Sequence, residues 1–241
     1  MTTVLFKSLN GSALYGTADP NKVHDVDYFQ VYAEDRLYYL GLGRPEGNGR
    51  GTQTMTTGVD GVLCDLVAYE VQHFALLAMA GNPAVLPMLW QHDGALGGET
   101  VTEQWRMLYR NRYAFASQKA VAAFKGMAYS ERKRFNAAVE MGVEVPVPWK
   151  SAMHSLRLLA MLAEFLRTGD MKADRRTVDA AVLVGVRTGA YSVERVANMV
   201  ADAEEEVDYW LERTHLPVKP DRDKVSKVMA DVLESLLFAK D

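Results

Sequence analysis

The chain has 241 residues, 49% hydrophobic and 24% charged, which is enough apolar material for one large core or two small ones and excludes disordered and collagen-like architectures. Its 27 basic and 31 acidic residues give a net charge of -4, which argues against a protein that binds nucleic acid through bulk charge. Cys64 is the single cysteine, which excludes intramolecular disulfides and thiolate zinc sites. Without a signal peptide or a run near roughly 18 apolar residues, we expect a cytoplasmic protein with no membrane partner.

The pattern of apolar and turn-forming residues changes near residue 100. Before it, short β-rich runs such as residues 26–32 and 62–68 alternate with turn residues. Beyond it, apolar residues at three-to-four spacing predict helices over residues 101–125, 130–141, 149–167, 175–188, 192–213 and 221–239, with a break at Gly126. We therefore predict an α+β fold: a small mixed-sheet core in residues 1–100, followed by a C-terminal helical bundle in residues 101–241.

Residues 41–61 hold seven of the eighteen glycines, which is too much backbone freedom for a regular element. Two interpretations stay open. The segment is either a flexible hairpin connection, or a substrate-contacting loop in which Arg44 and Arg50 reach phosphate.

The strongest local signal combines a Gly-Ser pair with three aspartates. Gly11 and Ser12 open a short helix after the first strand, where exposed N–H groups suit a triphosphate. Asp25 and Asp27 are two apart at the start of a strand, so their carboxylates share one face and repel unless a hard cation such as Mg²⁺ lies between them. Asp65, within an apolar run, is the expected third ligand.

Simpler explanations exist for each part of this signal. Gly-Ser is a common turn or cap, and Asp-x-Asp occurs by chance in solvated strands. Asp60 or Glu70 could replace Asp65, although we expect Glu70 on the solvated side of the following helix. The combination of all parts favours the metal site.

One polar stripe interrupts the apolar helix expected over residues 149–167. Lys150, His154 and Arg157 are spaced by four and three, so they stack on one face and would repel one another unless an anion faces them. We expect this stripe to bind nucleotide. The alternative is a structural salt-bridge stripe with Glu164 and a core histidine.

Charge is unevenly distributed in the second half. Residues 106–134 hold eight basic residues against Glu131 alone, a local charge of +7, whereas the acidic run over residues 202–208 is expected to be a solvated helix face. With aromatic residues nearby, the basic segment predicts acceptor binding by Arg106, Arg110, Arg112 and Lys119. A solvated basic face is the other interpretation.

The Gly11-Ser12 pair, the spacer, Asp25-x-Asp27 and Asp65 resemble the signature of the DNA polymerase beta-type nucleotidyltransferase superfamily. Residues 11–20, 65–74, 81–86, 150–159 and 166–169 resemble the predicted phage and bacterial members associated with RNA ligases and RNA repair, and the likeness runs nearly the whole chain. One departure is that Val23-His24 stands where that subfamily commonly has Ser-Asp.

The resemblance implies a Mg²⁺-dependent enzyme, with two ions and Mn²⁺ as a substitute, that moves NMP from an NTP to an acceptor hydroxyl and releases pyrophosphate. Residues 1–100 would be the catalytic core, and the helical domain of residues 101–241 would complete the cleft. Asp25, Asp27 and Asp65 would be catalytic and metal-binding; Gly11, Ser12, Lys150, His154 and Arg157 would bind nucleotide. The expected acceptor is an RNA 3′ end, such as that of a tRNA, in the host cytoplasm if a phage encodes the chain. Nucleotidylation of a protein or small molecule, and a non-catalytic antitoxin or binding module, are the alternatives. The preferred NTP and the oligomeric state are open.

Overall fold

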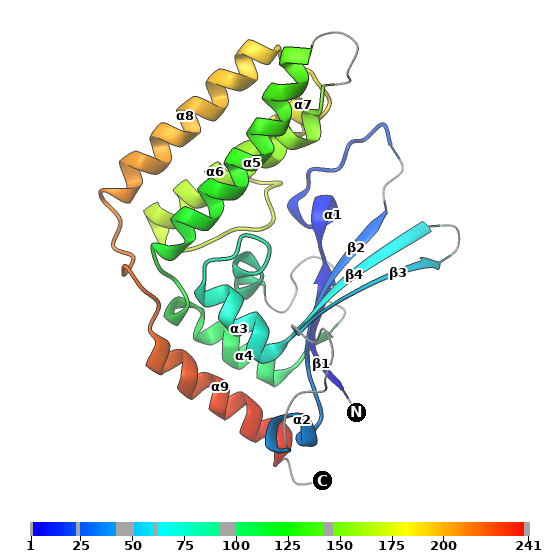
Figure 1. Cartoon of the computed structure of the whole chain (residues 1–241), viewed down its shortest axis with the longest axis vertical. Coiled ribbons are helices and arrows are strands. Elements are labelled where there is room, and N and C mark those ends of the chain that lie inside the picture. Colours follow the sequence, from blue (N-terminus) through cyan, green and yellow to red (C-terminus); the bar gives the residue numbers. More distant parts are fainter. Residues whose placement is uncertain are drawn as a thin grey trace.

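A five-stranded mixed sheet forms one wall of the protein, with helices packed against one of its faces (Figure 1). The computed structural model describes residues 2–22, 25–41, 51–59, 62–91, 100–141 and 147–238. The strands are β1 (Thr3–Leu9), β2 (Val26–Ala33), β3 (Thr52–Val59), β4 (Val62–Glu70) and β5 (Thr100–Val101), in the order β3-β4-β2-β1-β5. The β2–β4 pair is parallel and the other pairs are antiparallel.

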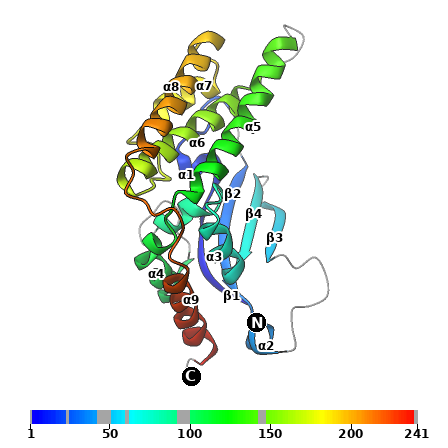
Figure 2. The same ribbon diagram turned by 60° about the vertical axis from the view of Figure 1, so that its left-hand side comes forward.

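The helices fall into two groups. Beside the sheet lie α1 (Gly11–Tyr15), α2 (Arg36–Leu40), α3 (Val71–Met79), α4 (Glu103–Arg110) and α9 (Arg222–Leu237), with short 3-10 helices over Leu86–Trp90 and Arg112–Ala114. The second group, α5 (Lys119–Met141), α6 (Trp149–Thr168), α7 (Ala180–Arg187) and α8 (Val193–Leu211), forms a bundle beyond one end of the sheet (Figures 1 and 2). The predicted α+β architecture is confirmed.

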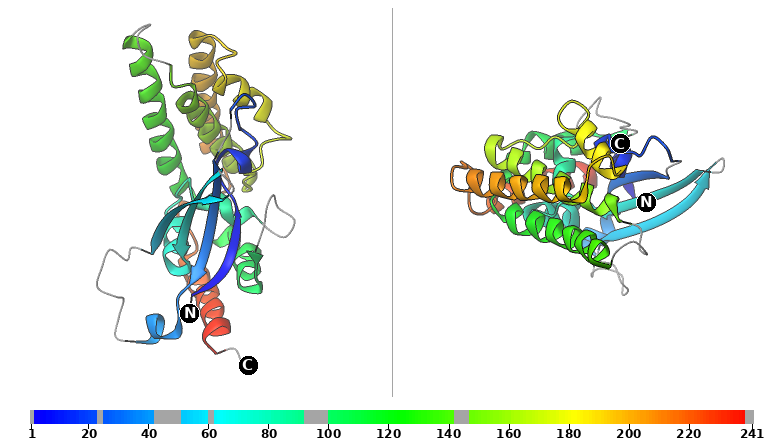
Figure 3. Two further views of the ribbon diagram at one scale, coloured as in Figure 1. Left: turned by 90° about the vertical axis from the view of Figure 1, so that its right-hand side faces the viewer. Right: turned by 90° about the horizontal axis from the view of Figure 1, so that it is seen from above.

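Aromatic packing joins the sheet to α3 and α4. Phe6 of β1 stacks on Trp105 of α4 with ring centroids 4.1 Å apart, and Phe74 of α3 contacts both Trp105 at 5.5 Å and Phe29 of β2 at 6.1 Å. The indole Nε1 of the buried Trp105 donates a hydrogen bond to the Gln91 carbonyl at 2.9 Å, so its one polar atom is satisfied. The opposite face of the sheet is the one toward the viewer in the left view of Figure 3.

The centre of the bundle is α6, which packs against α5, α7 and α8 and buries most of its circumference. Its bounds agree with the predicted helix to within one residue. The expected break at Gly126 is wrong: α5 runs through it, because a single glycine costs a helix only about 1 kcal/mol and the packing of α5 against α6 outweighs that cost.

The acidic run lies on an exposed face of α8, as predicted, and two of its acids also form ion pairs across the bundle. Lys125 of α5 pairs with Asp208 of α8, and Arg132 of α5 pairs with Glu204 of α8 at 2.5 Å. The basic and acidic helices therefore neutralise part of each other's charge.

The predicted division at residue 100 falls within β5, which pairs with β1, and α9 packs against α3 and α4 on the sheet side. The domain boundary stays a prediction. Within the described ranges, every helix is too short or too polar to cross a bilayer.

A buried arginine gives the bundle a polar centre that can be tested. The Arg175 side chain is 2% exposed and pairs with Glu164 of α6 and, at 2.7 Å, with Asp179. We expect Glu164→Gln to lower the free energy of unfolding by about 2 kcal/mol, because a charge-assisted hydrogen bond to a buried cation is lost. The matched control is Glu212→Gln in an exposed pair, which should change it by less than about 0.5 kcal/mol in urea denaturation. Equal losses in the two variants would contradict this role.

Candidate active site

Two of the predicted carboxylates lie side by side. In the parallel β2–β4 pair, Asp27 is in register with Asp65, so both side chains leave the sheet on the same face. That face also carries Phe29, which packs against α3, so the carboxylates face the helices rather than the uncovered side. From β3, the Thr56 hydroxyl donates a hydrogen bond to Asp65 Oδ1 at 2.5 Å and orients this carboxylate.

The Gly-Ser pair abuts Asp27. The Asn10 amide donates to the Asp27 carbonyl at 2.7 Å, and Gly11 opens α1 with φ of +55°. A Cβ on Gly11 would lie 1.9 Å from Asp27 Oδ2, so a side chain is excluded by both its backbone conformation and the neighbouring carboxylate. Ser12 follows as the next, half-buried residue of α1.

Asp25 lies one residue before β2 and is exposed, and residues 23 and 24 fall outside the described ranges. Across the described ranges, no three His, Cys, Asp or Glu side chains converge as a metal site. The structure thus places Asp27 beside Asp65, and within the described ranges Asp25 does not complete a group of three with them. The pair still suits Mg²⁺, which proteins commonly bind through one or two carboxylates and which takes its other ligands from substrate phosphates and water.

Glu70 does not replace Asp65, and its predicted solvated position is wrong. Its side chain is buried, caps α3 by accepting from the Gln72 and His73 amides at 3.0 Å, and accepts from the Tyr39 hydroxyl at 2.7 Å. These bonds occupy the carboxylate in holding β4 to α3. The other alternative, Asp60, lies outside the described residues, as do Arg44 and Arg50 of the glycine-rich segment.

The stripe on α6 turns toward α1. Lys150 is exposed, His154 is half-buried, and Arg157 is 9% exposed with its guanidinium 3.7 Å from the centre of the Tyr15 ring of α1. Among the described residues, no carboxylate pairs with Arg157. Glu164, the partner in the alternative salt-bridge interpretation, instead pairs with Arg175.

Arg187 joins this stripe from α7, although its place at the end of a predicted helix favours ordinary C-terminal complementation over phosphate contact in the sequence. Its guanidinium donates to the Thr17 carbonyl at 2.9 Å, just after α1, and it is close enough to His154 to affect its protonation. Burial, followed by the charges of Arg157, Lys150 and Arg187, lowers the pKa of His154 to about 3. His154 is therefore neutral at physiological pH, and the cationic members of the stripe are the lysine and the two arginines. In sequence, Arg187 is indistinguishable from an ordinary helix C-terminal arginine.

Helix α1 connects the carboxylates to the stripe. Gly11, at its first position, touches Asp27, and Tyr15, at its last, lies under Arg157. Five helical residues rise about 7 Å, which gives the approximate scale of the separation between Asp27 and Arg157 at the two ends of α1. Figures 1 and 2 show α1 between the sheet and α6.

The four residues predicted to bind acceptor do not form one free basic surface. Arg106 and Arg110 pair with Glu103 at 3.6 and 2.7 Å. Arg112 lies between the rings of Tyr109 and Tyr113, at 4.3 and 4.4 Å from their centres, and is 4.0 Å from Asp170. Lys119 is exposed at the start of α5. The local charge of +7 is thus partly neutralised by acids outside the segment.

The amino-acid sequence matches the model of a known protein family. The model of the RNA repair pathway DNA polymerase beta family, RlaP, matches residues 1–231. The chain belongs to this family. It is therefore a nucleotidyltransferase of the DNA polymerase beta type, as the resemblance implied.

Similarity to individual known proteins is weaker than the match to the family model. No curated protein sequence matches this RlaP-family chain. A nucleotidyltransferase-like protein from Exiguobacterium sibiricum 255-15 has a solved structure that aligns with 97% of this chain and 74% of its own, at 10% identity and a TM-score of 0.31.

The Gly11 contact generates a direct test of the RlaP-family site. We expect Gly11→Ala to reduce nucleotide transfer at least about 100-fold, because the added methyl displaces the Asp27 carboxylate, with a stability loss of about 1 to 2 kcal/mol. Gly126→Ala is the control, since its Cβ would meet open space on α5 and helix propensity should raise stability by about 1 kcal/mol without loss of activity. Full activity in Gly11→Ala would contradict the assignment.

His154 predicts an acid-dependent loss of stability. Since its pKa is about 3 in the folded chain and about 6.5 unfolded, only the unfolded state gains this proton as pH falls below 6.5. Between pH 7 and 5, the wild type should lose about 2 kcal/mol more stability than His154→Gln in urea titrations. His215→Gln, which removes an exposed histidine, should keep the wild-type loss. An identical loss in His154→Gln would show that His154 is not buried among cations.

Proposed function

We propose that the chain transfers a nucleoside monophosphate from an NTP to the 3′ hydroxyl of an RNA, tRNA included, and releases pyrophosphate. The observation that carries the proposal is the in-register pair Asp27 and Asp65, with Gly11 packed against the first. The RNA acceptor rests on the family's description as an RNA repair pathway. We place the activity in the cytoplasm, in keeping with the single cysteine.

Asp27 and Asp65 are the residues that would hold Mg²⁺, two ions being expected and Mn²⁺ a substitute, with Asp25 as the further predicted ligand. When bound, the metal supplies Lewis-acid stabilisation of phosphate charge and lowers the pKa of a coordinated hydroxyl. The Thr56 hydroxyl occupies Asp65 Oδ1, so Oδ2 is the oxygen of that carboxylate best placed to bind a ligand.

The remaining residues bind and orient the triphosphate. In this proposal the backbone at Gly11 and Ser12 approaches the β- and γ-phosphates, because the start of α1 presents backbone N–H groups to an anion. The missing side chain at Gly11 makes room for the Asp27 carboxylate beside them. Lys150, Arg157 and Arg187 compensate the charge of the triphosphate and of departing pyrophosphate. The acceptor O3′ attacks the α-phosphorus, and the bond from that phosphorus to the bridging oxygen breaks.

The roles of the two arginines follow from burial. Within the described structure the Arg157 guanidinium has no carboxylate partner; it lies 3.7 Å from the Tyr15 centroid and 3.5 Å from Met161 Sδ. A buried guanidinium without a carboxylate is electrostatically incomplete, so an entering phosphate gains a charge-assisted partner that has little water to displace. Neutral His154 adds a hydrogen-bonding group without adding charge.

The test follows the label from each α-³²P-NTP, with Mg²⁺ and total tRNA, into RNA, protein or small molecules. We expect label in RNA, reduced at least about 100-fold in Asp27→Asn and in Asp65→Asn, because each loses a negative charge at the reacting phosphate. Asp231→Asn, an exposed change on α9, is the matched control and should retain full transfer. Asp25→Asn, assayed in parallel, tests the third predicted ligand.

Other outcomes of this assay distinguish the alternatives. Label in protein would identify a toxin-like nucleotidylating enzyme, and label in a small molecule would identify a small-molecule modifier. Absence of transfer with both Mg²⁺ and Mn²⁺ would identify a non-catalytic binding or antitoxin module. Each of these results contradicts the RNA acceptor.

A further inference from the structure

The edge of the sheet at β3 is open in the described structure. Among the described strands, β3 has β4 as its one neighbour, and it packs mainly against that strand. Every residue from 52 to 58 is exposed, and Figures 1 and 2 show β3 at the margin of the sheet. A strand in this position presents a row of backbone N–H and C=O groups to any strand that can add to it.

The register determines which backbone groups of β3 point outward. Just before β3, the Glu70 amide donates to the Gly51 carbonyl at 2.7 Å, so these two residues form a hydrogen-bonded pair at the start of the β3–β4 ladder. Hydrogen-bonded and non-hydrogen-bonded pairs alternate along an antiparallel ladder, and this register runs without a shift to the end of β3. The backbone groups of every second residue therefore point away from β4, namely those of Thr52, Thr54, Thr56 and Gly58.

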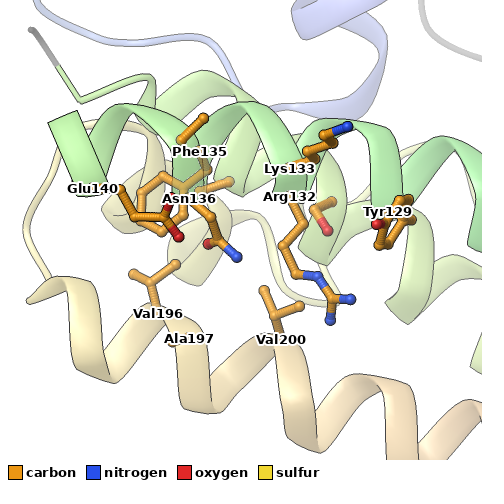
Figure 4. Close-up of a pocket in the computed structure, with 12 residues that line it drawn as sticks. Tyr129, Arg132, Lys133, Phe135, Asn136, Glu140, Val196, Ala197 and Val200 are labelled. Atoms are coloured by element: carbon orange, nitrogen blue, oxygen red, sulfur yellow. The ribbon is translucent and has the colours of Figure 1, made fainter.

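The strand lacks the features by which proteins usually protect a sheet edge. Its eight residues include no charged residue and no proline, and its pairing with β4 has no bulge. Charged side chains are present elsewhere on the surface, for example Arg132, Lys133 and Glu140 of α5, which line the hollow between α5 and α8 (Figure 4). The β3 sequence is instead neutral and rich in threonine, which favours pairing with another strand.

A second copy of the same strand fits this edge. In an antiparallel pair of two β3 strands centred on Met55, residue 54 pairs with residue 56 and residue 52 with residue 58, so the outward backbone groups of both copies are all paired. The two Met55 side chains then lie directly opposite each other, and each is 56% exposed in the single chain. The strands bring no like charges together, and one two-fold axis closes the assembly.

We propose that the chain dimerises by antiparallel pairing of β3 with β3 of a second copy, which joins the two sheets into one. The interface adjoins the candidate active site, because the Thr56 hydroxyl orients Asp65 and the partner's Thr54 pairs with Thr56 in this register. The pairing therefore restrains the strand that positions this carboxylate. Dimerisation goes beyond the proposed transfer function and does not depend on it.

Sedimentation equilibrium of the full chain tests the dimer. We expect the monomer to become a dimer as protein concentration rises through about 10 µM, since a strand pair is smaller than a standard interface. Met55→Lys should raise the dissociation constant at least about tenfold, because it places two like charges opposite each other. Leu76→Lys is the matched control: it changes a residue of α3 that is 53% exposed, away from the edge, and should leave the constant unchanged.

Two further experiments locate the pairing. Thr54→Pro removes an outward N–H and spares the bonds to β4, so it should weaken the dimer at least about tenfold with an unchanged circular dichroism spectrum. In a Cys64→Ser background, Met55→Cys should form an intermolecular disulfide on mild oxidation, because the two Cβ atoms lie within about 5 Å in this register. Gln53→Cys should form none, because residue 53 lies opposite residue 57 of the second copy.

The opposite results are equally specific. A chain that stays monomeric up to about 1 mM, or a dimer that is equally stable in Met55→Lys and Thr54→Pro, would overturn the proposal. A disulfide formed by Gln53→Cys and not by Met55→Cys would do the same. Dimerisation is measured without nucleotide, so loss of transfer in the ³²P assay with an intact dimer affects the proposed function alone.

Discussion

The close approach of α1 to the Asp27 carboxylate is the contact on which the site depends. It requires a residue with no Cβ and a positive φ at position 11, and both are met by Gly11. A five-residue helix has little stability of its own, so α1 is held from outside. Arg176 donates to the Ala13 carbonyl at 2.6 Å, and Arg187 donates to the Thr17 carbonyl at 2.9 Å. The bundle thereby orients the element that contacts the Asp27 carboxylate.

Arginines of two kinds lie around α6. Arg175 is compensated on both sides, by Glu164 and Asp179, and serves packing. Arg157 lies on an aromatic ring without a carboxylate, and Arg187 has its pKa lowered by burial although the charge of Asp19 opposes the shift. The charge of Arg157 therefore has no carboxylate partner where we propose that the triphosphate binds. The charge of Arg175, by contrast, is compensated within the bundle.

Local sequence signals predicted those parts of the molecule that local interactions determine. The apolar pattern predicted the bounds of α6 to within one residue. Asp27 and Asp65 were both expected in β-rich runs, and the structure pairs them on neighbouring strands. Partners distant in the chain were not predictable: Lys125 and Asp208 are separated by 83 residues, and a count of charge along the sequence treats them as two opposite patches. The place of Arg187 in the stripe was not predictable for the same reason, since only the folded chain brings it beside His154.

The last helix closes the first half of the protein. Beside the pairing of β5 with β1, α9 packs on α3 and α4, and Gln104 of α4 donates to Ser235 of α9 at 3.2 Å across 131 residues. Such long-range contacts form slowly and late, because a large loop must close before they contribute. During synthesis on the ribosome, α3 and α4 therefore expose the apolar surface that α9 later covers. This exposed surface favours chaperone binding until α9 has been synthesised.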